Sequence, residues 1–180
     1  KTGTLTCNEL TAVELRLDDN TRWQVTGAGY RPVGEIRRVD DGARVDESTL
    51  VAAMHIAVAC NEAELIAVDG AWRTRGDPTD LALLVLAAKA GIERDHVVAR
   101  WPVVARIAYE PERRFAASFH QRDGSGWVAV KGAPERVLVP FGSQRRVGVV
   151  VPTDDVPTVG EAKLRAILAV LSDTPPPASP

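Results

Sequence analysis

The 180-residue sequence predicts an α+β fold, an antiparallel β-sheet flanked by helices. Two observations predict this class. Runs of expected strands with helices inserted between them replace the strict strand–helix alternation that a parallel sheet requires. Hydrophobic residues make up 45% of the chain and charged residues 26%, an ordinary balance for a globular protein large enough to bury its own core. We therefore expect one domain without internal repeats.

The N-terminal region predicts two paired strands and an irregular connection. Residues 10–17 alternate between apolar and polar side chains, which is typical of a half-buried strand. Asp-Asp-Asn at 18–20 supplies a turn, and residues 23–25 return as the partner strand. Three glycines and a proline within 27–34 then exclude a helix.

Two helices are predicted in the middle of the chain. Asp46 or Ser48 can cap the first helix, which carries an apolar stripe and ends near Cys60. Asp77 precedes a proline, and this pair supplies the N-cap and the first residue of the second helix. Leucine and valine follow at helical spacing, and Gly91 is placed to end the second helix.

The pattern then returns to strands. Residues 103–109, 115–120 and 127–131 predict three strands, because each is apolar and rich in strand-forming side chains. Asp-Gly-Ser-Gly at 123–126 predicts a hairpin turn between the last two strands.

Helices and a tail are expected at the C-terminal end. A short helix is predicted at 134–138 and a final one near 159–171, where leucine and isoleucine recur on one face. The proline-rich stretch 173–180 predicts an extended, disordered tail. Because the sequence begins at Lys1 without a methionine or an apolar leader, we expect a segment of a longer protein with no secretory signal.

Composition argues against several classes of function. The formal net charge of −2 lacks the basic surplus of a nucleic-acid-binding protein. No apolar run approaches the roughly 20 residues of a membrane-spanning helix. Cys7 and Cys60 cannot form a disulfide framework or complete a zinc site. The sequence also lacks the motifs of phosphate-binding loops, zinc proteases and serine hydrolases.

Six short segments carry a resemblance to a known family. Lys-Thr-Gly-Thr-Leu-Thr at the start and Lys-Gly-Ala-Pro-Glu further along resemble segments of the P-type ATPases, ion pumps that hydrolyse ATP through an aspartyl-phosphate. Four other segments resemble motifs that lie between these two in the family, and the glycine-rich one resembles the bacterial calcium-type branch. The six segments are residues 1–6, 26–34, 59–63, 76–83, 109–114 and 131–135.

This resemblance implies a domain organisation. Residues 1–8 would be a remnant of the phosphorylation loop and the hinge, and 9–150 the nucleotide-binding (N) domain. Residues 151–180 would form a C-terminal helix and tail before the phosphorylation domain resumes. The chain would bind ATP for a calcium-type cation pump and deliver its γ-phosphate to an aspartate of that pump. We expect a soluble monomeric fragment of a plasma-membrane protein, facing the cytoplasm. Its partners would be the phosphorylation, actuator and transmembrane domains, and no nucleic acid.

The resemblance also implies an adenine site. Tyr109 resembles the family's aromatic platform, and stacking of a base on such a ring contributes about 1–3 kcal/mol. Lys131 precedes Gly132 and Ala133, so a cation stands where the backbone allows a nucleotide to approach closely. With the adenine on Tyr109, the phosphates would point toward Lys131 and Arg114. The alternatives are an ordinary strand aromatic for Tyr109 and a solvated lysine at a hairpin edge for Lys131.

Four further residues are implied as nucleotide contacts. Arg114 resembles a phosphate-facing lysine of the family and Arg113 the basic position before it, although both also suit a charged strand face. Asp80 stands where the family has a glutamate near the adenine amino group, and its alternative role is that of a first-turn acid favoured by the helix dipole. Thr79 can serve the helix cap or the ligand.

We expect no catalysis by the chain alone. Lys1, Thr2, Gly3 and Thr4 resemble the phosphorylation loop, but the aspartate nucleophile would precede Lys1, and the Mg²⁺-holding motifs are absent from the sequence. Mg²⁺ is expected only in the parent pump, and no metal site in this chain. Two alternatives stay open: a truncated remnant without a working pocket, and a free-standing hydrolase of the haloacid-dehalogenase type. The hydrolase would need an Asp-x-Asp nucleophile on a parallel sheet, which the sequence does not offer.

Overall fold

The fold was analysed in a computed structural model that describes residues 9–17, 21–39, 47–122, 125–133, 136, 147–153 and 163–171. The described elements, in chain order, are β1 (Thr11–Leu17), β2 (Arg22–Val25), β3 (Ile36–Arg38), α1 (Glu47–Ala59), β4 (Glu64–Val68), β5 (Ala71–Arg75), α2 (Pro78–Lys89), α3 (Arg94–Arg100), β6 (Val103–Ile107), β7 (Phe115–Arg122), β8 (Ser125–Gly132), β9 (Val147–Thr153) and β10 (Lys163–Leu171). The expected loop remnant at 1–8 and most of the expected helix at 134–138 lie outside the described residues.

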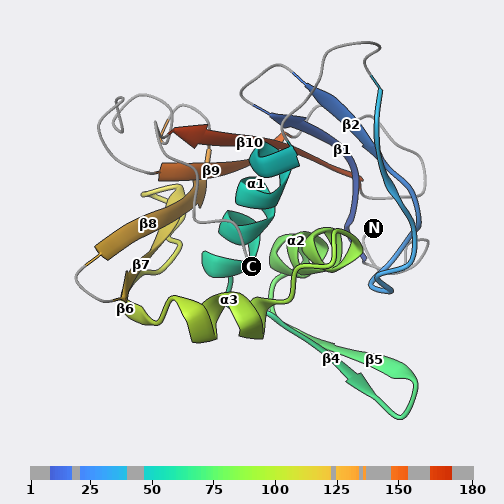
Figure 1. The fold of residues 1–180 in the computed structure, drawn as a ribbon, viewed down its shortest axis with the longest axis horizontal. Helices are drawn as coiled ribbons and strands as arrows, with labels where there is room; N and C mark the ends of the chain where they lie inside the picture. The colour runs from blue at the N-terminus through green and yellow to red at the C-terminus, as the bar shows by residue number, and fades with distance from the viewer. Residues whose placement is uncertain are drawn as a thin grey trace.

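One large sheet dominates the described part of the chain. Its strand order is β3-β2-β1-β10-β9-β8-β7-β6, and neighbouring strands pair antiparallel except in the pairs β1–β10 and β8–β9 (Figure 1). Strands β4 and β5 form a separate two-stranded sheet. The predicted α+β class, an antiparallel sheet with helices against it, is confirmed.

The two central helices cover one region of the sheet. Helix α1 packs against β1, β8, β9 and β10 and also contacts α2 and α3 (Figure 1). Met54 and Val58 of α1 and Leu83 and Leu86 of α2 are completely buried, which explains why both helices carry apolar side chains nearly all round. As predicted, Asp77 caps α2: its side chain accepts a hydrogen bond of 2.8 Å from the Thr79 N–H.

The strands predicted at both ends of the sheet are confirmed. Strands β1 and β2 pair antiparallel, with Leu15 opposite Trp23. Strands β6, β7 and β8 form a meander, in which Ala116 lies opposite Lys131. The pairing of Arg122 with Ser125 brackets the expected hairpin turn, whose residues 123–124 lie outside the described part.

The helix predicted at 159–171 is wrong. Residues 163–171 form β10, which lies between β1 and β9 near the middle of the sheet. A short, nearly continuous apolar run lacks the alternation of a half-buried strand, so periodicity alone does not distinguish it from a buried helix. The leucine spacing at 164, 168 and 171 therefore fits both structures.

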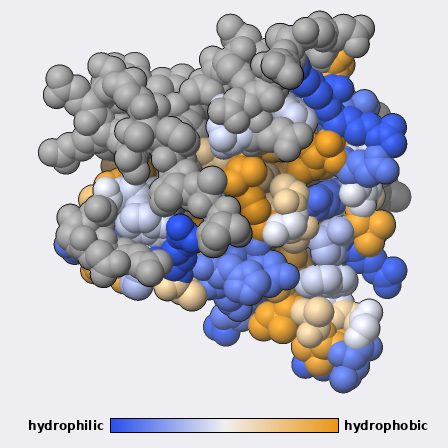
Figure 2. Space-filling model, viewed as in Figure 1, coloured by the Kyte–Doolittle hydropathy of each residue, from blue (hydrophilic) through white to orange (hydrophobic). Residues whose placement is uncertain are grey.

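The β4–β5 hairpin was not predicted, although its turn carries a signal. Asp69 and Gly70 adopt φ values of 51° and 77°, the pair of positive φ values that an Asp-Gly hairpin turn needs. Figure 1 shows the hairpin projecting from the body, and Figure 2 shows apolar and hydrophilic atoms mixed on it. Ile66 and Trp72 are 50% and 38% exposed there. None of the helices in the described ranges is long and apolar enough to cross a membrane.

Candidate functional site

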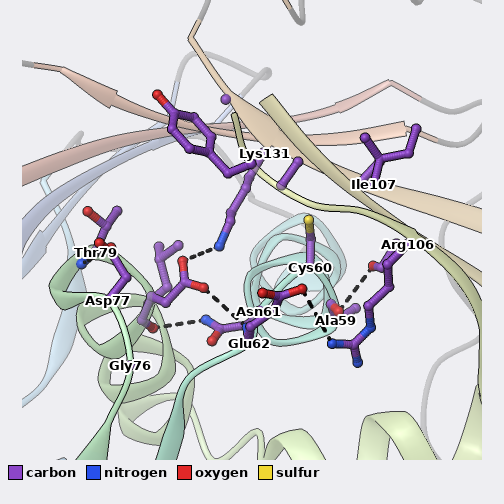
Figure 3. A pocket seen from close by; sticks show the side chains of 17 residues that line it. Ala59, Cys60, Asn61, Glu62, Gly76, Asp77, Thr79, Arg106, Ile107 and Lys131 are labelled. Carbon is purple, nitrogen blue, oxygen red and sulfur yellow. Dashed lines mark hydrogen bonds and ion pairs between the residues drawn. The ribbon is translucent and has the colours of Figure 1, made fainter. Parts of the chain in front are cut away.

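A pocket of about 580 Å³ opens where α1 ends, α2 begins and strands β6, β7 and β8 come together. Its volume falls within the range of about 300–1,000 Å³ that small-molecule sites occupy. In Figure 3, Lys131 lies between Thr79 on one side and Arg106 on the other. The lining residues are Ala59, Cys60, Asn61, Glu62, Gly76, Asp77, Thr79, Asp80, Leu83, Arg106, Ile107, Tyr109, Ala116, Ala117, Ser118, Lys131 and Gly132.

Asn61 ties the two helices together beneath the pocket. Its Nδ2 donates to the carbonyls of Ala57, at the end of α1, and Asp80, in the first turn of α2, at 3.1 and 2.9 Å. Its Oδ1 accepts from the Ala63 N–H at 2.9 Å, so both ends of this buried amide are satisfied. Asn61 therefore fixes the position of Asp80 relative to the α1 terminus.

An ion pair between Asp80 and Lys131 lies inside the pocket. Their side chains are only 10% and 15% exposed, and Lys131 reaches Asp80 Oδ1 from β8. The second carboxylate oxygen, Oδ2, accepts from the Glu62 N–H at 3.1 Å. A carboxylate in the first turn is also favoured by the positive end of the α2 dipole. Asp80 is thus a first-turn acid that also lines the pocket, a position compatible with both roles that the sequence left as alternatives.

Tyr109 and Gly132 line the same pocket. Tyr109 lies two residues beyond the end of β6 and is 58% exposed, so its ring is open to a ligand. A Cβ at Gly132 would lie 2.5 Å from both the Arg114 carbonyl oxygen and Phe115 Cβ. Only glycine lets these two segments approach so closely. The structure therefore brings together Tyr109, Lys131, Gly132 and two residues of the first turn of α2, Thr79 and Asp80.

Three predicted contacts do not line the pocket: Arg113, Arg114 and Ala133. Arg113 folds back on its own turn, where Nη2 lies 3.0 Å from Glu110 Oε2 and Nη1 donates to the Ala108 carbonyl at 3.3 Å. The Arg114 N–H donates to the Glu110 carbonyl at 2.7 Å, and the Ala133 N–H donates to the Arg114 carbonyl at 2.9 Å. These backbone contacts hold the turn that follows Tyr109 against the end of β8.

Arg106 and Glu62 are pocket residues to which the sequence analysis gave no role. Arg106 Nη1 lies 3.7 Å from Glu62 Oε1, with side chains 37% and 63% exposed. The available signal was a single cation inside the otherwise apolar run 103–108. An edge strand of a sheet also tolerates a charged side chain, so the pattern did not distinguish a pocket residue from an ordinary surface charge.

The buried side of the pocket contains a thiol and a histidine network. Burial raises the pKa of the Cys60 thiol to about 11, so it stays protonated and is a poor nucleophile. Ser118 Oγ lies 2.8 Å from His120 Nε2, while His120 Nδ1 lies 2.9 Å from the Trp101 carbonyl. The His120 ring also stacks on Trp127, with centroids 4.6 Å apart. These contacts support the pocket wall.

The described residues do not supply a metal site. Within those ranges, no three His, Cys, Asp or Glu side chains gather closely enough to hold an ion. The described side chains therefore do not form a Mg²⁺ site by themselves. The expected phosphorylation-loop residues 1–4 lie outside the described part of the chain.

Comparison with known proteins gives a consistent result. A family described as "P-type ATPase, cytoplasmic domain N" matches residues 49–150. The probable cation-transporting ATPase F of Mycobacterium tuberculosis is 37% identical over 147 residues, which cover 80% of this chain and 16% of that protein. The cation-transporting ATPase pma1 of Synechocystis is 34% identical over 145 residues, and the calcium-transporting ATPase of Bacillus subtilis 31% over 140. Each of the last two matches covers 77% of this chain and 16% of the relative. The chain therefore spans a small part of the length of these relatives.

Proposed function

Because this chain belongs to the cytoplasmic N domains of the P-type ATPases, we propose that its pocket binds ATP for such a pump. The observation that carries the proposal is the shared pocket: an exposed aromatic ring and a fixed pair of opposite charges, contributed by separate elements, face one cavity of ligand size. Such a combination of an apolar platform with a few convergent polar groups is typical of nucleotide-sized sites.

The adenine base would stack on Tyr109. That ring is exposed at the pocket, and stacking on an aromatic face contributes about 1–3 kcal/mol per base. The Asp80 carboxylate has lone pairs left after its two contacts and can accept from the adenine amino group. Lys131 can donate to a ring nitrogen of the base, and Gly132 leaves room beside it. Thr79 lines the same cavity.

The roles of the residues outside this cavity stay predictions. Arg114 was expected to face the phosphates, and Arg113 and Ala133 to contact the nucleotide; their positions in and beside the turn that follows Tyr109 do not test these roles. In the parent pump the domain would move as a body about its hinge, so that the γ-phosphate reaches the aspartate of the phosphorylation domain. Mg²⁺, cation transport, the plasma-membrane location and the contacts with the actuator and transmembrane domains belong to that whole pump.

A titration of the 180-residue chain with ATP, followed by calorimetry and by amide chemical shifts, tests the proposal. Tyr109→Ala should weaken ATP binding by roughly tenfold or more, because the stacking platform is lost. Lys131→Glu should also weaken it, because it replaces the cation by a second buried acid. Trp72→Ala is the matched control, because Trp72 is an exposed aromatic on β5 that does not line the pocket.

Thermal stability separates binding from a remnant without a working pocket. A ligand that binds only the folded state stabilises it by RT ln(1 + [L]/Kd), so the midpoint of unfolding should rise with ATP concentration. An unchanged midpoint at millimolar ATP would support the remnant instead. Unchanged ATP affinity in both pocket variants would place the binding site elsewhere on the domain.

A further inference from the structure

We propose that Lys89, the last residue of α2, is a site of Nε-acylation by an acyl phosphate, and that the acyl group releases residues 26–34 from α2. Residues 26–34, here called the glycine loop, lie between β2 and β3 and do not line the pocket. The proposal therefore stands or falls independently of nucleotide binding. It comes from the partner of the Lys89 amine, which differs in kind from the partner of Lys131.

The Lys89 amine holds the glycine loop against α2. Its Nζ donates a hydrogen bond of 2.7 Å to the carbonyl of Thr26, 63 residues earlier in the chain. Gly27, with a φ of 87°, brings the backbone of the loop beside the amine, and a Cβ at this position would lie 3.2 Å from Nζ. A second hydrogen bond, from the Gly29 N–H to Thr11 Oγ1 at 3.1 Å, attaches the loop to β1. Loss of the Lys89 contact would thus free the α2 side of the loop.

The partner of Lys89 does not require a charged amine. A carbonyl oxygen accepts a hydrogen bond from an uncharged amine as well as from an ammonium, whereas the carboxylate of Asp80 stabilises the ammonium of Lys131. Among the described residues, no acid pairs with Lys89. Its half-buried position also lowers the pKa of the amine, because burial disfavours the charged form. Lys89 is therefore present as the uncharged amine more often than a solvated lysine is.

Only the uncharged amine can be acylated. Its lone pair attacks the carbonyl carbon of the acyl phosphate, and the N–C bond forms while the C–O bond to the phosphate breaks. Phosphate leaves with the bonding electrons, the nitrogen gives a proton to water, and the product is an uncharged amide. Because Lys89 is only half-buried, a small acyl donor can approach its amine from solvent.

The acyl group cannot be added without moving the glycine loop. The amide places a carbonyl and its substituent next to Nζ, where the backbone of Gly27 already lies close. Acylation also removes the positive charge from the last turn of α2, where the helix dipole favours a cation. Both changes weaken the contact with the Thr26 carbonyl, so we expect the loop to separate from α2.

Acetylation of the 180-residue chain by acetyl phosphate tests the reactivity of Lys89. The chain is incubated at mildly alkaline pH, and peptide mass mapping locates the modified lysines and gives the rate at each. Lys89 should react roughly tenfold faster than Lys131, whose ammonium is held by Asp80, and faster than free Nα-acetyl-lysine amide. Unfolding in urea should abolish both differences. A rate for Lys89 in the folded chain at or below that of the free amine would overturn the proposal, and this measurement needs no substitution.

Amide hydrogen exchange tests the release of the glycine loop. Lys89→Arg is the matched control, because arginine keeps a cation at the end of α2 and stays protonated, so it is not acylated. After treatment with acetyl phosphate, this variant carries the same acetyl groups at the other amines of the chain. Acetylation should accelerate exchange at residues 26–34 severalfold in the unsubstituted chain and leave it unchanged in Lys89→Arg. Equal exchange rates in the two treated proteins would overturn the release of the loop, and thermal unfolding of both shows whether each is folded.

Discussion

The two charged pairs of the pocket have the same chemistry and different consequences. Asp80 comes from a helix and Lys131 from a strand, and their side chains are 10% and 15% exposed. The Asp80 carboxylate also accepts a hydrogen bond from the Glu62 N–H. Glu62 and Arg106 are 63% and 37% exposed and stand 3.7 Å apart. Burial and the extra hydrogen bonds, not the presence of opposite charges, make the first pair part of the architecture. The second pair is held weakly and contributes little to the free energy of unfolding.

The largest expected effect comes from breaking the buried pair. Asp80→Ala leaves the Lys131 ammonium in a mostly buried site without its counter-charge and removes the acceptor of the Glu62 N–H. We expect a loss of about 3 kcal/mol in the free energy of unfolding, measured by urea denaturation. Glu62→Ala, which breaks the exposed pair, should cost less than about 1 kcal/mol. Equal losses in the two variants would remove the distinction between the pairs.

The second largest effect tests how closely the end of β8 packs against the start of β7. Gly132→Ala would place a Cβ 2.5 Å from a backbone oxygen and from Phe115 Cβ, so the β7–β8 pairing must shift. We expect a loss of about 2 kcal/mol in the free energy of unfolding and weaker nucleotide binding. Gly126→Ala on the same strand is the control, because its nearest contact would be 3.2 Å. Its cost should be clearly smaller in the same urea experiment.

Much of the frame around the pocket was predictable from sequence, for physical reasons. Asp77 followed by a proline predicts the start of α2, and the capping hydrogen bond from Thr79 confirms it. The alternating and apolar runs predict β1, β6, β7 and β8, because the spacing of apolar residues within each run is itself the signal of a strand. The start of α2 and these strands bring Tyr109, Lys131 and Asp80 to one cavity.

The β4–β5 hairpin was missed although its Asp69–Gly70 turn carries a local signal. The other failures have a common cause, which is that long-range contacts decided them. Strand β10 is set by its neighbours β1 and β9 and not by its own periodicity. The alternative roles of Asp80 could not be separated, because its partner Lys131 lies 51 residues away in the chain. Arg106 received no role from the sequence, because its partner Glu62 lies on a distant segment of the chain. Local sequence carries no record of such pairings.

The smallest expected effect concerns pH and the wall behind the buried pair. Burial lowers the pKa of His120 from 6.5, so in the folded state the ring is neutral where the unfolded chain has begun to bind a proton. The Trp101 carbonyl only accepts, so Nδ1 of the neutral ring carries the hydrogen. Ser118 Oγ lies 2.8 Å from Nε2 and 3.1 Å from the Ala59 carbonyl, and its one hydrogen can serve only one of these two acceptors at a time. The stability that this arrangement contributes is fully present above pH 6.5 and is lost as the pH falls toward the folded-state pKa. His55, whose pKa burial also lowers, contributes a loss of the same sign, so the test must compare variants.

We therefore expect the free energy of unfolding of the unsubstituted chain to decrease between about pH 7 and pH 5, and that of His120→Gln to decrease less steeply. Urea denaturation at several pH values measures the slopes. His96→Gln is the control, because the His96 side chain is 83% exposed on α3, and its slope should match that of the unsubstituted chain. Because Ser118 also lines the pocket, ATP that binds better when the ring is neutral would lower the folded-state pKa of His120 further and make the slope steeper. Identical slopes for the unsubstituted chain and His120→Gln would mean that His120 binds a proton in the folded state at no cost in stability. The wall of the pocket around His120 would then be less rigid than the buried Asp80–Lys131 pair suggests.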